Sequence, residues 1–389
     1  MRRVDGRHCV RHALSSAPQA RSPRPVWIAA IGKAASSMAL GAHDALGVAL
    51  ERGLVITKDG HVQPELLALS GVEIYESAHP VPDDRSLAAG ERLLRWVEEL
   101  PDAADPLFLI SGGASSLVEV LESGASFADL ARVTAGGLAA GIPVGELNAR
   151  RARLSRIKGG RLTARLGARP ARALFLSDVP GDDPAVIGSG LLGPCADTAD
   201  RVERVVLASI DHAREGVAAA AAQLGLEVYA CPRRFDDDAL RLAVRFTHEL
   251  RLGTAQVRVW GGESTVKLPE SPGRGGRNQH LALAAARLIA GQSDLLLLAA
   301  GTDGTDGVTD DAGARVDAET CARLALAELD ADECLRRADS GTALAAAGDL
   351  IHTGPTGTNV GDLVIGIKLS AQTARALPDR RGGTPARVL

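Results

Sequence analysis

The chain has 389 residues, a formal net charge of −4 and 46% hydrophobic residues, the composition of a globular protein with room for two or three domains. Only 3% of the residues are aromatic, which argues against a stacking platform for single-stranded nucleic acid and against the aromatic belt of a membrane protein. The acidic balance argues against a generally basic, phosphate-coating surface. We therefore expect neither nucleic acid nor a membrane as a partner.

Cysteine usage and the N-terminal residues indicate the compartment. The five cysteines are odd in number and include no CxxC pair, so the sequence predicts neither a disulfide scaffold nor a zinc knuckle. Residues 1–8 lack the apolar stretch of a secretory signal, and no apolar run approaches the ~20 residues of a membrane span. We expect a cytoplasmic protein with reduced thiols.

Short apolar, β-branched runs alternate with Ala-rich segments of helical spacing, which is the rhythm of βαβ units. The predicted strands of the first part cover residues 26–31, 54–57, 72–77, 107–110 and 173–176. The predicted helices of this part are an Ala-rich helix that extends toward residue 50, a helix at 84–100, a long helical stretch at 127–166 and a helix at 201–224. The strand 227–230 and the loop 231–238 lead into a second domain.

The second part repeats the rhythm with strands at 257–260, 295–299 and 363–367 and a helix that begins near Asn278. The sequence therefore predicts an α/β protein with domains at 1–230 and 231–389. In an open parallel sheet, ligands collect at the carboxyl ends of the strands. These ends carry Gly, Ser, Asp and two glycine-flanked lysines, which favours a site for a small anion.

Lysine is rare in this chain, with five lysines against 39 arginines. Lys33 follows the first predicted strand beside a glycine, and Lys158 precedes two glycines. The stretch 111–116, Ser-Gly-Gly-Ala-Ser-Ser, follows another strand and suits a phosphate or carboxylate, because its glycines allow close backbone approach. The chain has neither a Walker A motif nor a G-x-G-x-x-G fingerprint, which argues against P-loop and dinucleotide-binding proteins.

Three carboxylates follow the strand 173–176, at Asp178, Asp182 and Asp183. One could accept a proton from a substrate hydroxyl, and others could hold Mg²⁺. Further along the chain, Arg277 opens a predicted helix at a position where an anion would bind. Each of these patterns has a structural alternative, because turns and helix caps use the same residue types.

Taken in order, nine loops resemble those of the glycerate 2-kinase family, also called the MOFRL glycerate kinases, of which some members have carried the name hydroxypyruvate reductase. The loops that carry the resemblance begin at Gly32, His79, Ser111, Ile157, Ser177, Gly262, Gly275, Ala300 and Gly354. The resemblance covers about residues 26 to 368. It implies a larger Rossmann-like N-terminal domain with a parallel sheet, a smaller mixed α/β C-terminal domain and an active site in the cleft between them.

The resemblance further implies that ATP and Mg²⁺ are used to phosphorylate the 2-hydroxyl of D-glycerate, giving 2-phosphoglycerate. Lys33 and Arg277 would neutralise charge on the phosphoryl group or the carboxylate, and Asp178 would orient or deprotonate the hydroxyl. Asp182 is the candidate metal ligand. The candidate binding residues are Ser111, Gly112, Gly113, Ser115, Asn148, Lys158, Gly159, Glu263, Asn278, Asp303, Thr356 and Asn359.

The chain departs from the family pattern at Arg153 and His280, where the family usually has His and Glu, and in the loop that begins at Leu191. These changes leave open a kinase of a related small hydroxy acid. Two other hypotheses also stay open: an NAD(P)H-dependent hydroxypyruvate reductase, and a protein that binds a sugar acid without turnover. The sequence leaves the oligomeric state open, a homodimer included.

Overall fold

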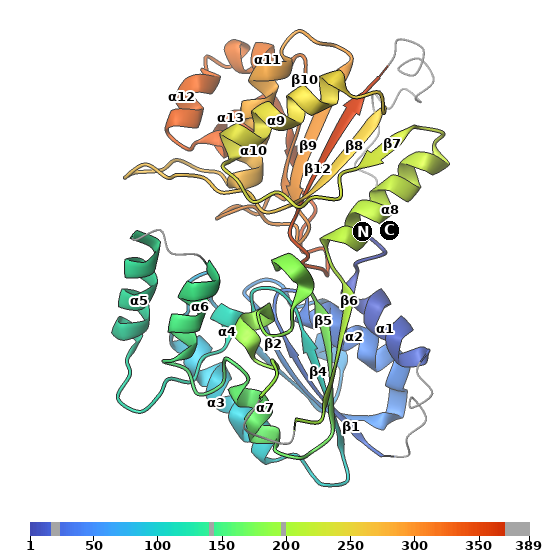
Figure 1. The fold of residues 1–389 in the computed structure, drawn as a ribbon, viewed down its shortest axis with the longest axis vertical. Coiled ribbons are helices and arrows are strands. Elements are labelled where there is room, and N and C mark those ends of the chain that lie inside the picture. The colour runs from blue at the N-terminus through green and yellow to red at the C-terminus, as the bar shows by residue number, and fades with distance from the viewer. Residues whose placement is uncertain (17–23, 140–143, 196–199, 370–389) are drawn as a thin grey trace. The chain divides into compact units, whose positions relative to one another are not determined.

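The computed structural model describes residues 1–16, 24–139, 144–195 and 200–369. The chain divides into two compact units (Figure 1). The first unit comprises Met1–Gly216 together with Gly301–Thr305 and Thr353–Asp362. The second comprises Val217–Ala300, Asp306–His352 and the described residues from Leu363 onward. Two short segments that are distant in sequence thus belong to the first unit.

A six-stranded sheet forms the centre of the first unit. Its strands are β1 (Val26–Ile31), β2 (Leu50–Lys58), β3 (Val72–Ser77), β4 (Asp105–Ile110), β5 (Ala171–Leu176) and β6 (Val202–Ala208). All neighbours pair in parallel, in the order β3-β2-β1-β4-β5-β6. This is the strand order of a Rossmann fold, whose ligand crevice lies where the order reverses, between β1 and β4. The predicted α/β class and the Rossmann-like sheet are confirmed.

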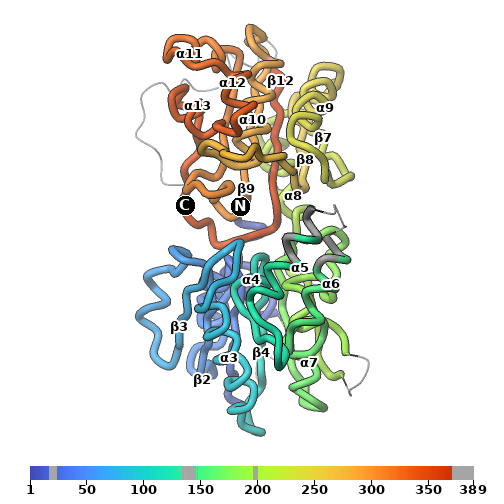
Figure 2. Tube along the Cα trace, turned by 90° about the vertical axis from the view of Figure 1, so that its left-hand side faces the viewer, coloured from blue at the N-terminus to red at the C-terminus, as the bar shows by residue number. Residues whose placement is uncertain are grey.

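Helices cover both faces of this sheet, with α1 and α2 on one side and α3 and α7 on the other (Figure 1). The helices of the first unit are α1 (Gly6–Ser15), α2 (Ala35–Leu46), α3 (Asp84–Glu98), α4 (Ala114–Leu117), α5 (Phe127–Ala139), α6 (Val144–Ala152) and α7 (Arg161–Leu166). Helices α5 and α6 lie side by side (Figure 2). The helix α8 (Ile210–Gln223) contains the boundary between the units.

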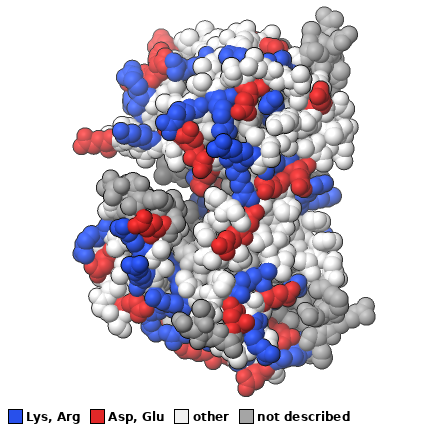
Figure 3. Space-filling model, in the orientation of Figure 1, with Lys and Arg blue, Asp and Glu red and all other residues white. Residues whose placement is uncertain are grey.

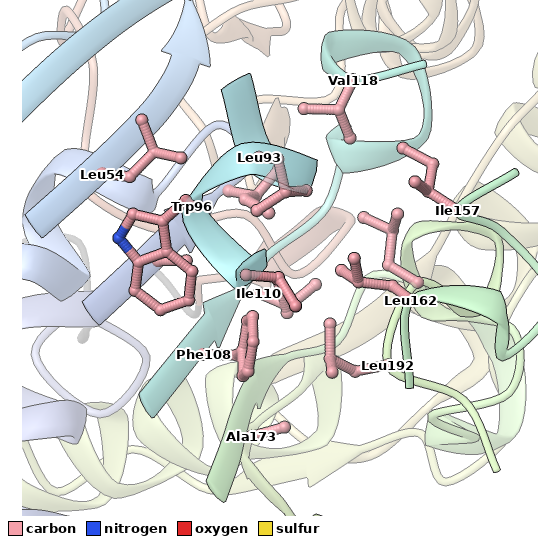
Figure 4. Close-up of a cluster of buried hydrophobic side chains, with 14 of the residues drawn as sticks. Leu54, Leu93, Trp96, Phe108, Ile110, Val118, Ile157, Leu162, Ala173 and Leu192 are labelled. Atoms are coloured by element: carbon pink, nitrogen blue, oxygen red, sulfur yellow. The ribbon is translucent and has the colours of Figure 1, made fainter. Parts of the chain in front are cut away.

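The core of the first unit explains how its loops are fixed. Trp96 of α3 packs edge-on against Phe108 of β4, with ring centroids 5.6 Å apart, and the cluster extends to Ile157 and Leu162 (Figure 4). Both aliphatic side chains are fully buried. Because these two residues flank the Lys158-Gly159-Gly160 turn, the core holds that turn from both ends.

A mixed sheet forms the centre of the second unit, in the order β11-β10-β9-β12-β8-β7. Its strands are β7 (Val228–Ala230), β8 (Val257–Gly262), β9 (Leu295–Gly301), β10 (Gly313–Asp317), β11 (Leu350–Ile351) and β12 (Asp362–Lys368). Strand β10 runs antiparallel to β9 and β11, whereas β7 and β8 are parallel. The predicted mixed α/β character of this part is confirmed.

The described part of the second unit contains five further helices: α9 (Ala239–Leu252), α10 (Arg277–Ile289), α11 (Thr320–Leu326), α12 (Ala331–Arg336) and α13 (Ser340–Ala347). Phe246 of α9 stacks on Trp260 of β8 and meets Phe235 edge-on. The side chain of Asp238 caps α9 by accepting from the amides of Leu240 and Arg241. Most of the few large aromatic side chains thus lie in the two hydrophobic cores.

Two predicted elements are wrong. The helix predicted at 201–224 begins as strand β6 and becomes helical only at Ile210. The long helical stretch predicted at 127–166 consists of three separate helices, α5, α6 and α7. Helical spacing and the β-branched pattern of a strand both fit Val202, Val205 and Val206. The segment is a strand because it pairs with β5.

Within the described ranges, no helix is both long enough and apolar enough to cross a membrane. Acidic and basic side chains are interspersed on the face shown in Figure 3. Many of them form surface ion pairs, for example Arg85 with Asp59 and Arg150 with Glu146. All five cysteines lie in described parts of the chain, and none of them forms a disulfide there.

Candidate functional site

Lys33 lies in the turn after β1, next to the point where the strand order of the first unit reverses. Its Nζ donates to Oδ2 of Asp303 at 2.7 Å, and the two side chains are 15% and 7% exposed. Gly32 precedes it with φ 129°, and a Cβ there would collide with Ser111. The turn therefore requires glycine at residue 32, which brings the backbone after β1 against the backbone after β4.

Asp303 follows β9 and belongs to the first unit. Its Oδ1 accepts from the Thr305 amide at 3.0 Å. Burial alone would raise the pKa of this carboxyl group, but the Lys33 ammonium and the hydrogen bonds it accepts lower its pKa below the ordinary value. Asp303 is thus an ionised partner that holds the Lys33 side chain.

The loop after β4 places two predicted residues in contact. A Cβ on Gly112 would collide with Oδ2 of Asp178 and Nδ2 of Asn359, so both side chains lie directly against this glycine. Nδ2 of Asn359 donates to Oδ2 of Asp178 at 3.2 Å. The backbone of Gly112 also accepts from the Lys33 amide at 3.0 Å. Gly112 therefore lies between the candidate catalytic lysine and the candidate catalytic aspartate.

The remaining loop residues have defined positions. The Ser111 hydroxyl accepts from the Ala34 amide at 3.1 Å, which joins the loop after β4 to the residue before α2. Gly113 has φ 83°, a conformation that favours glycine. Thr356 donates its hydroxyl to the Thr302 carbonyl, and its amide donates to the Asp303 carbonyl at 3.3 Å. The segment 353–362 thereby fixes the loop that carries Asp303.

Two histidines border Lys33: His79, which begins one of the loops that carry the family resemblance, and His61, which no sequence motif singles out. A Cβ on Gly113 would lie 3.1 Å from both Cδ2 of His79 and Cγ of Lys33. Burial, followed by the charges of Lys33 and Lys58, lowers the pKa of His79 to about 3. Nδ1 of His61 lies 3.2 Å from the Lys33 carbonyl, and burial lowers its pKa too. Both imidazoles are therefore neutral near pH 7.

His79 precedes Pro80 in the loop after β3, a position from which a histidine could act as a general base. Its low pKa makes it a poor base at neutral pH. No local pattern singles out His61, since its position beside Lys33 arises only from the fold.

Lys158 has a different environment from Lys33. Its side chain is fully buried, and Nζ donates to Oε2 of Glu119 at 2.5 Å and to the Ser115 carbonyl at 2.7 Å. The adjacent Gly159 has φ 62° and donates its amide to the Ser189 carbonyl at 2.9 Å. Lys158 thus uses its charge inside the protein, and the structure does not present its ammonium to a ligand. Asn148 is partly exposed on α6.

In the second unit, Arg277 forms an ion pair with Glu263 at 2.5 Å. Asn278 is 1% exposed, and its amide and side chain both donate to Oδ1 of Asp306. The Gln279 amide donates to the other carboxylate oxygen at 2.7 Å. The Asp306 carboxylate thus accepts from the backbone amides at the start of α10, where the sequence predicts an anion.

The acidic turn after β5 holds the candidate metal ligand. Asp182 has φ 54° in a short 3₁₀ turn at Pro180–Asp182. Among the residues that the structure describes, no three His, Cys, Asp or Glu side chains are grouped as a metal site would require. A divalent cation would depend on ligands from a bound molecule for most of its coordination shell.

Lys33, Gly112 and Asp178 follow β1, β4 and β5, which are adjacent in the sheet. They therefore meet at the carboxyl edge, at the switch point, where a doubly wound sheet binds its ligand. The arrangement offers the Lys33 ammonium, which is paired with Asp303, and the Asp178 carboxylate around a loop of small residues. It suits a small anionic molecule that carries a hydroxyl group.

Comparison with known proteins adds to this geometry. The family described as a domain of unknown function, DUF4147, matches residues 1–221, and the MOFRL family matches residues 256–362. D-glycerate 2-kinase from Thermotoga maritima is 35% identical over 381 residues, which cover 88% of this chain and 90% of the relative. The chain belongs to the glycerate 2-kinase family. This confirms the family resemblance found in the loops.

One further relative and one solved structure support the assignment. Glycerate 2-kinase from Pyrococcus horikoshii is 32% identical and covers 89% of this chain, which spans 88% of that relative. The crystal structure of glycerate kinase from Thermotoga maritima superposes with a TM-score of 0.80 at 33% identity. It covers 94% of this chain, and the chain covers 96% of it.

Proposed function

We propose that the protein is an ATP-dependent kinase that phosphorylates the 2-hydroxyl of D-glycerate to give 2-phosphoglycerate. Family membership and the names of the relatives support this reaction. The observation that carries the proposal is the pairing of Lys33 with Asp303 beside Asp178, around Gly112. A fixed ammonium next to a carboxylate is the combination that phosphoryl transfer to an alcohol needs.

Asp178 orients the attacking hydroxyl and accepts its proton. Its Oδ2 already accepts from the Asn359 side chain, so the amide fixes one face of the carboxylate. The carboxylate held in this way then acts on the substrate hydroxyl. A carboxylate held by a neighbouring amide keeps a defined direction, which matters because phosphoryl transfer depends mostly on positioning.

Lys33 supplies positive charge to the transferring phosphoryl group or to the glycerate carboxylate. The ion pair with Asp303 holds its long side chain in one rotamer, which lowers the conformational cost of binding an anion. Neutral His79 beside Lys33 adds no charge there. Arg277, which forms an ion pair with Glu263 in the second unit, remains a predicted catalytic residue.

Magnesium would enter with the nucleotide. Kinase sites usually hold Mg²⁺ through one or two carboxylates together with phosphate oxygens and water. The carboxylates of Asp178 and Asp182, which follow one strand, fit such a partial set of hard oxygen donors. When bound, the cation would neutralise charge on the phosphates.

A coupled assay for ADP release, with and without D-glycerate and across a panel of small hydroxy acids, tests the proposal. We expect D-glycerate to give the highest kcat/KM. If only another hydroxy acid is turned over, that acid and not D-glycerate is the substrate. If glycerate raises the Tm without any turnover, the protein binds a sugar acid without catalysis. Oxidation of NADH in the presence of hydroxypyruvate would support the reductase hypothesis instead. The turn after β1 argues against that hypothesis, because it lacks the G-x-G-x-x-G fingerprint.

A further inference from the structure

The ion pair between Lys158 and Glu119 is buried completely. Both side chains are 0% exposed, and Nζ lies 2.5 Å from Oε2 of Glu119. Arg151 of α6 adds a second positive charge near the same carboxylate. Burial lowers the pKa of Lys158, while Glu119 opposes that effect and favours the ammonium form. The charged lysine therefore depends on Glu119.

Stability alone does not explain such a pair. Moving two charges out of water is costly, and apolar residues of similar volume often give equal or greater stability. The hydrogen bonds of the pair indicate what it does. Nζ of Lys158 donates to the Ser115 carbonyl at 2.7 Å, and Oε1 of Glu119 accepts from the Val120 amide at 3.0 Å. The pair thus fixes backbone on the C-terminal side of the loop that contains Gly112.

The opposite side of this loop touches the candidate catalytic residues. The Gly112 carbonyl accepts from the Lys33 amide, and its Cα faces Asp178 and Asn359. Only two residues, Gly113 and Ala114, separate Gly112 from Ser115. A shift of the Ser115 carbonyl would therefore move the glycine against which Asp178 is placed.

The turn that carries Lys158 is itself fixed. The amides of Gly159 and Gly160 donate to the carbonyls of Ser189 and Gly190 at 2.9 and 2.7 Å. A Cβ on Gly188 would lie 3.3 Å from Cβ of Ala114, so the 187–190 turn also borders the loop. The lysine thus extends from a rigid base.

We propose that Lys158 is a positioning residue whose ammonium, held by Glu119, fixes the Ser115 carbonyl and so sets the Gly112 backbone against Asp178. Lys158 acts through the loop and does not contact substrate. This inference rests on the proposed kinase function, because it concerns the same site.

The test compares three variants with the wild-type protein: Lys158→Met, the double variant Glu119→Leu with Lys158→Met, and a control double variant, Glu73→Leu with Arg92→Met. The control removes the ion pair of Arg92 on α3 with Glu73 on β3, at the edge of the sheet. Thermal melting gives the Tm of each variant. Glycerate-dependent ADP release gives kcat and the KM values for glycerate and for ATP, measured on folded protein.

We expect Lys158→Met to lower Tm, because it leaves the Glu119 charge buried without its lysine. The double variant should recover most of that Tm, yet its kcat should remain at least about tenfold below wild type, with KM changed less than about twofold. The control should keep kcat within about twofold. A double variant with wild-type kcat would overturn the inference, and so would a higher KM at unchanged kcat, which marks a binding residue.

Glu119→Gln provides a second test if the double variant does not fold. Without this carboxylate, burial and Arg151 both favour the neutral lysine. We expect kcat to fall as pH rises from about 6 to 9, with a steeper decline than in wild type. A pH profile that superposes on that of wild type would overturn the inference. Wild-type protein without glycerate-dependent turnover would instead refute the proposed function.

Discussion

Replacing Asp303 by Asn removes the charge that holds Lys33 and leaves the side-chain volume almost unchanged. At the observed 2.7 Å between Nζ and Oδ2, the Coulomb attraction is about 6 kcal/mol for an effective dielectric constant of about 20. Desolvation offsets part of this, and breaking a buried pair usually costs about 3–5 kcal/mol. Because Lys33 keeps 15% of its side chain exposed, we expect about 3 kcal/mol.

For a unit of about 200 residues this loss corresponds to a Tm lowered by about 6–12 °C. We also expect kcat to fall at least about tenfold, because Lys33 without its carboxylate partner no longer holds one side-chain position for contact with the anionic substrate. Thermal melting and glycerate-dependent ADP release measure the two effects. Asp349→Asn is the matched control, because Asp349 pairs with Arg323 at 2.6 Å in the second unit and should lower Tm without lowering kcat.

The pH dependence of the effect has a definite sign. The pKa of Asp303 is lower in the folded protein than its ordinary value, so its stabilisation is fully present at neutral pH and is lost as pH falls through the folded pKa. The Tm difference between wild type and Asp303→Asn should be constant from about pH 6 to 8 and shrink below about pH 4. A variant with wild-type Tm and kcat at neutral pH would refute the reasoning.

Four further predictions follow from the same contacts. Lys33→Ala and Asp178→Asn should each lower kcat at least about a hundredfold in the ADP-release assay; near wild-type kcat would remove that residue from the mechanism. Gly112→Ala should lower both Tm and kcat, because its Cβ collides with Asp178 and Asn359; a well-folded and fully active variant would contradict the packing. His79→Gln should leave the shape of the pH profile between about pH 6 and 9 unchanged, because the pKa of His79 is about 3; loss of an ionisation in that range would show that it titrates. Asp306→Ala should destabilise the protein by about 1–2 kcal/mol in denaturant unfolding through loss of the α10 cap; an unchanged midpoint would refute the cap.

The sequence is most informative about strands and the loops after them. Val26–Ile31 and Val72–Ser77 are predicted at their observed bounds, because their β-branched runs end in small or polar residues. The segment 201–208 is misassigned, since its valines also satisfy helical spacing and only pairing with β5 distinguishes the two. Local sequence patterns therefore misassign an element when its secondary structure depends on pairing with a strand that is distant in the sequence.

The same limit applies to the candidate site. The glycine-flanked positions of Lys33 and Lys158 look alike in sequence, but one pairs with Asp303 and the other is buried against Glu119. These partners are 270 and 39 residues away along the chain, so no local motif reveals them. The start of α10 likewise suits an anion, and Asp306, which is 28 residues from Asn278, occupies it.

The regiochemistry of the product tests the central claim most directly. D-Glycerate and ATP are incubated with the wild-type protein and with Asp178→Asn, and the product is examined by ³¹P NMR without proton decoupling. Phosphate on carbon 2 couples to a single proton and gives a doublet, whereas phosphate on carbon 3 couples to two protons and gives a triplet. We predict a doublet that depends on Asp178, and a triplet or the absence of any glycerate phosphate would contradict the proposed 2-kinase.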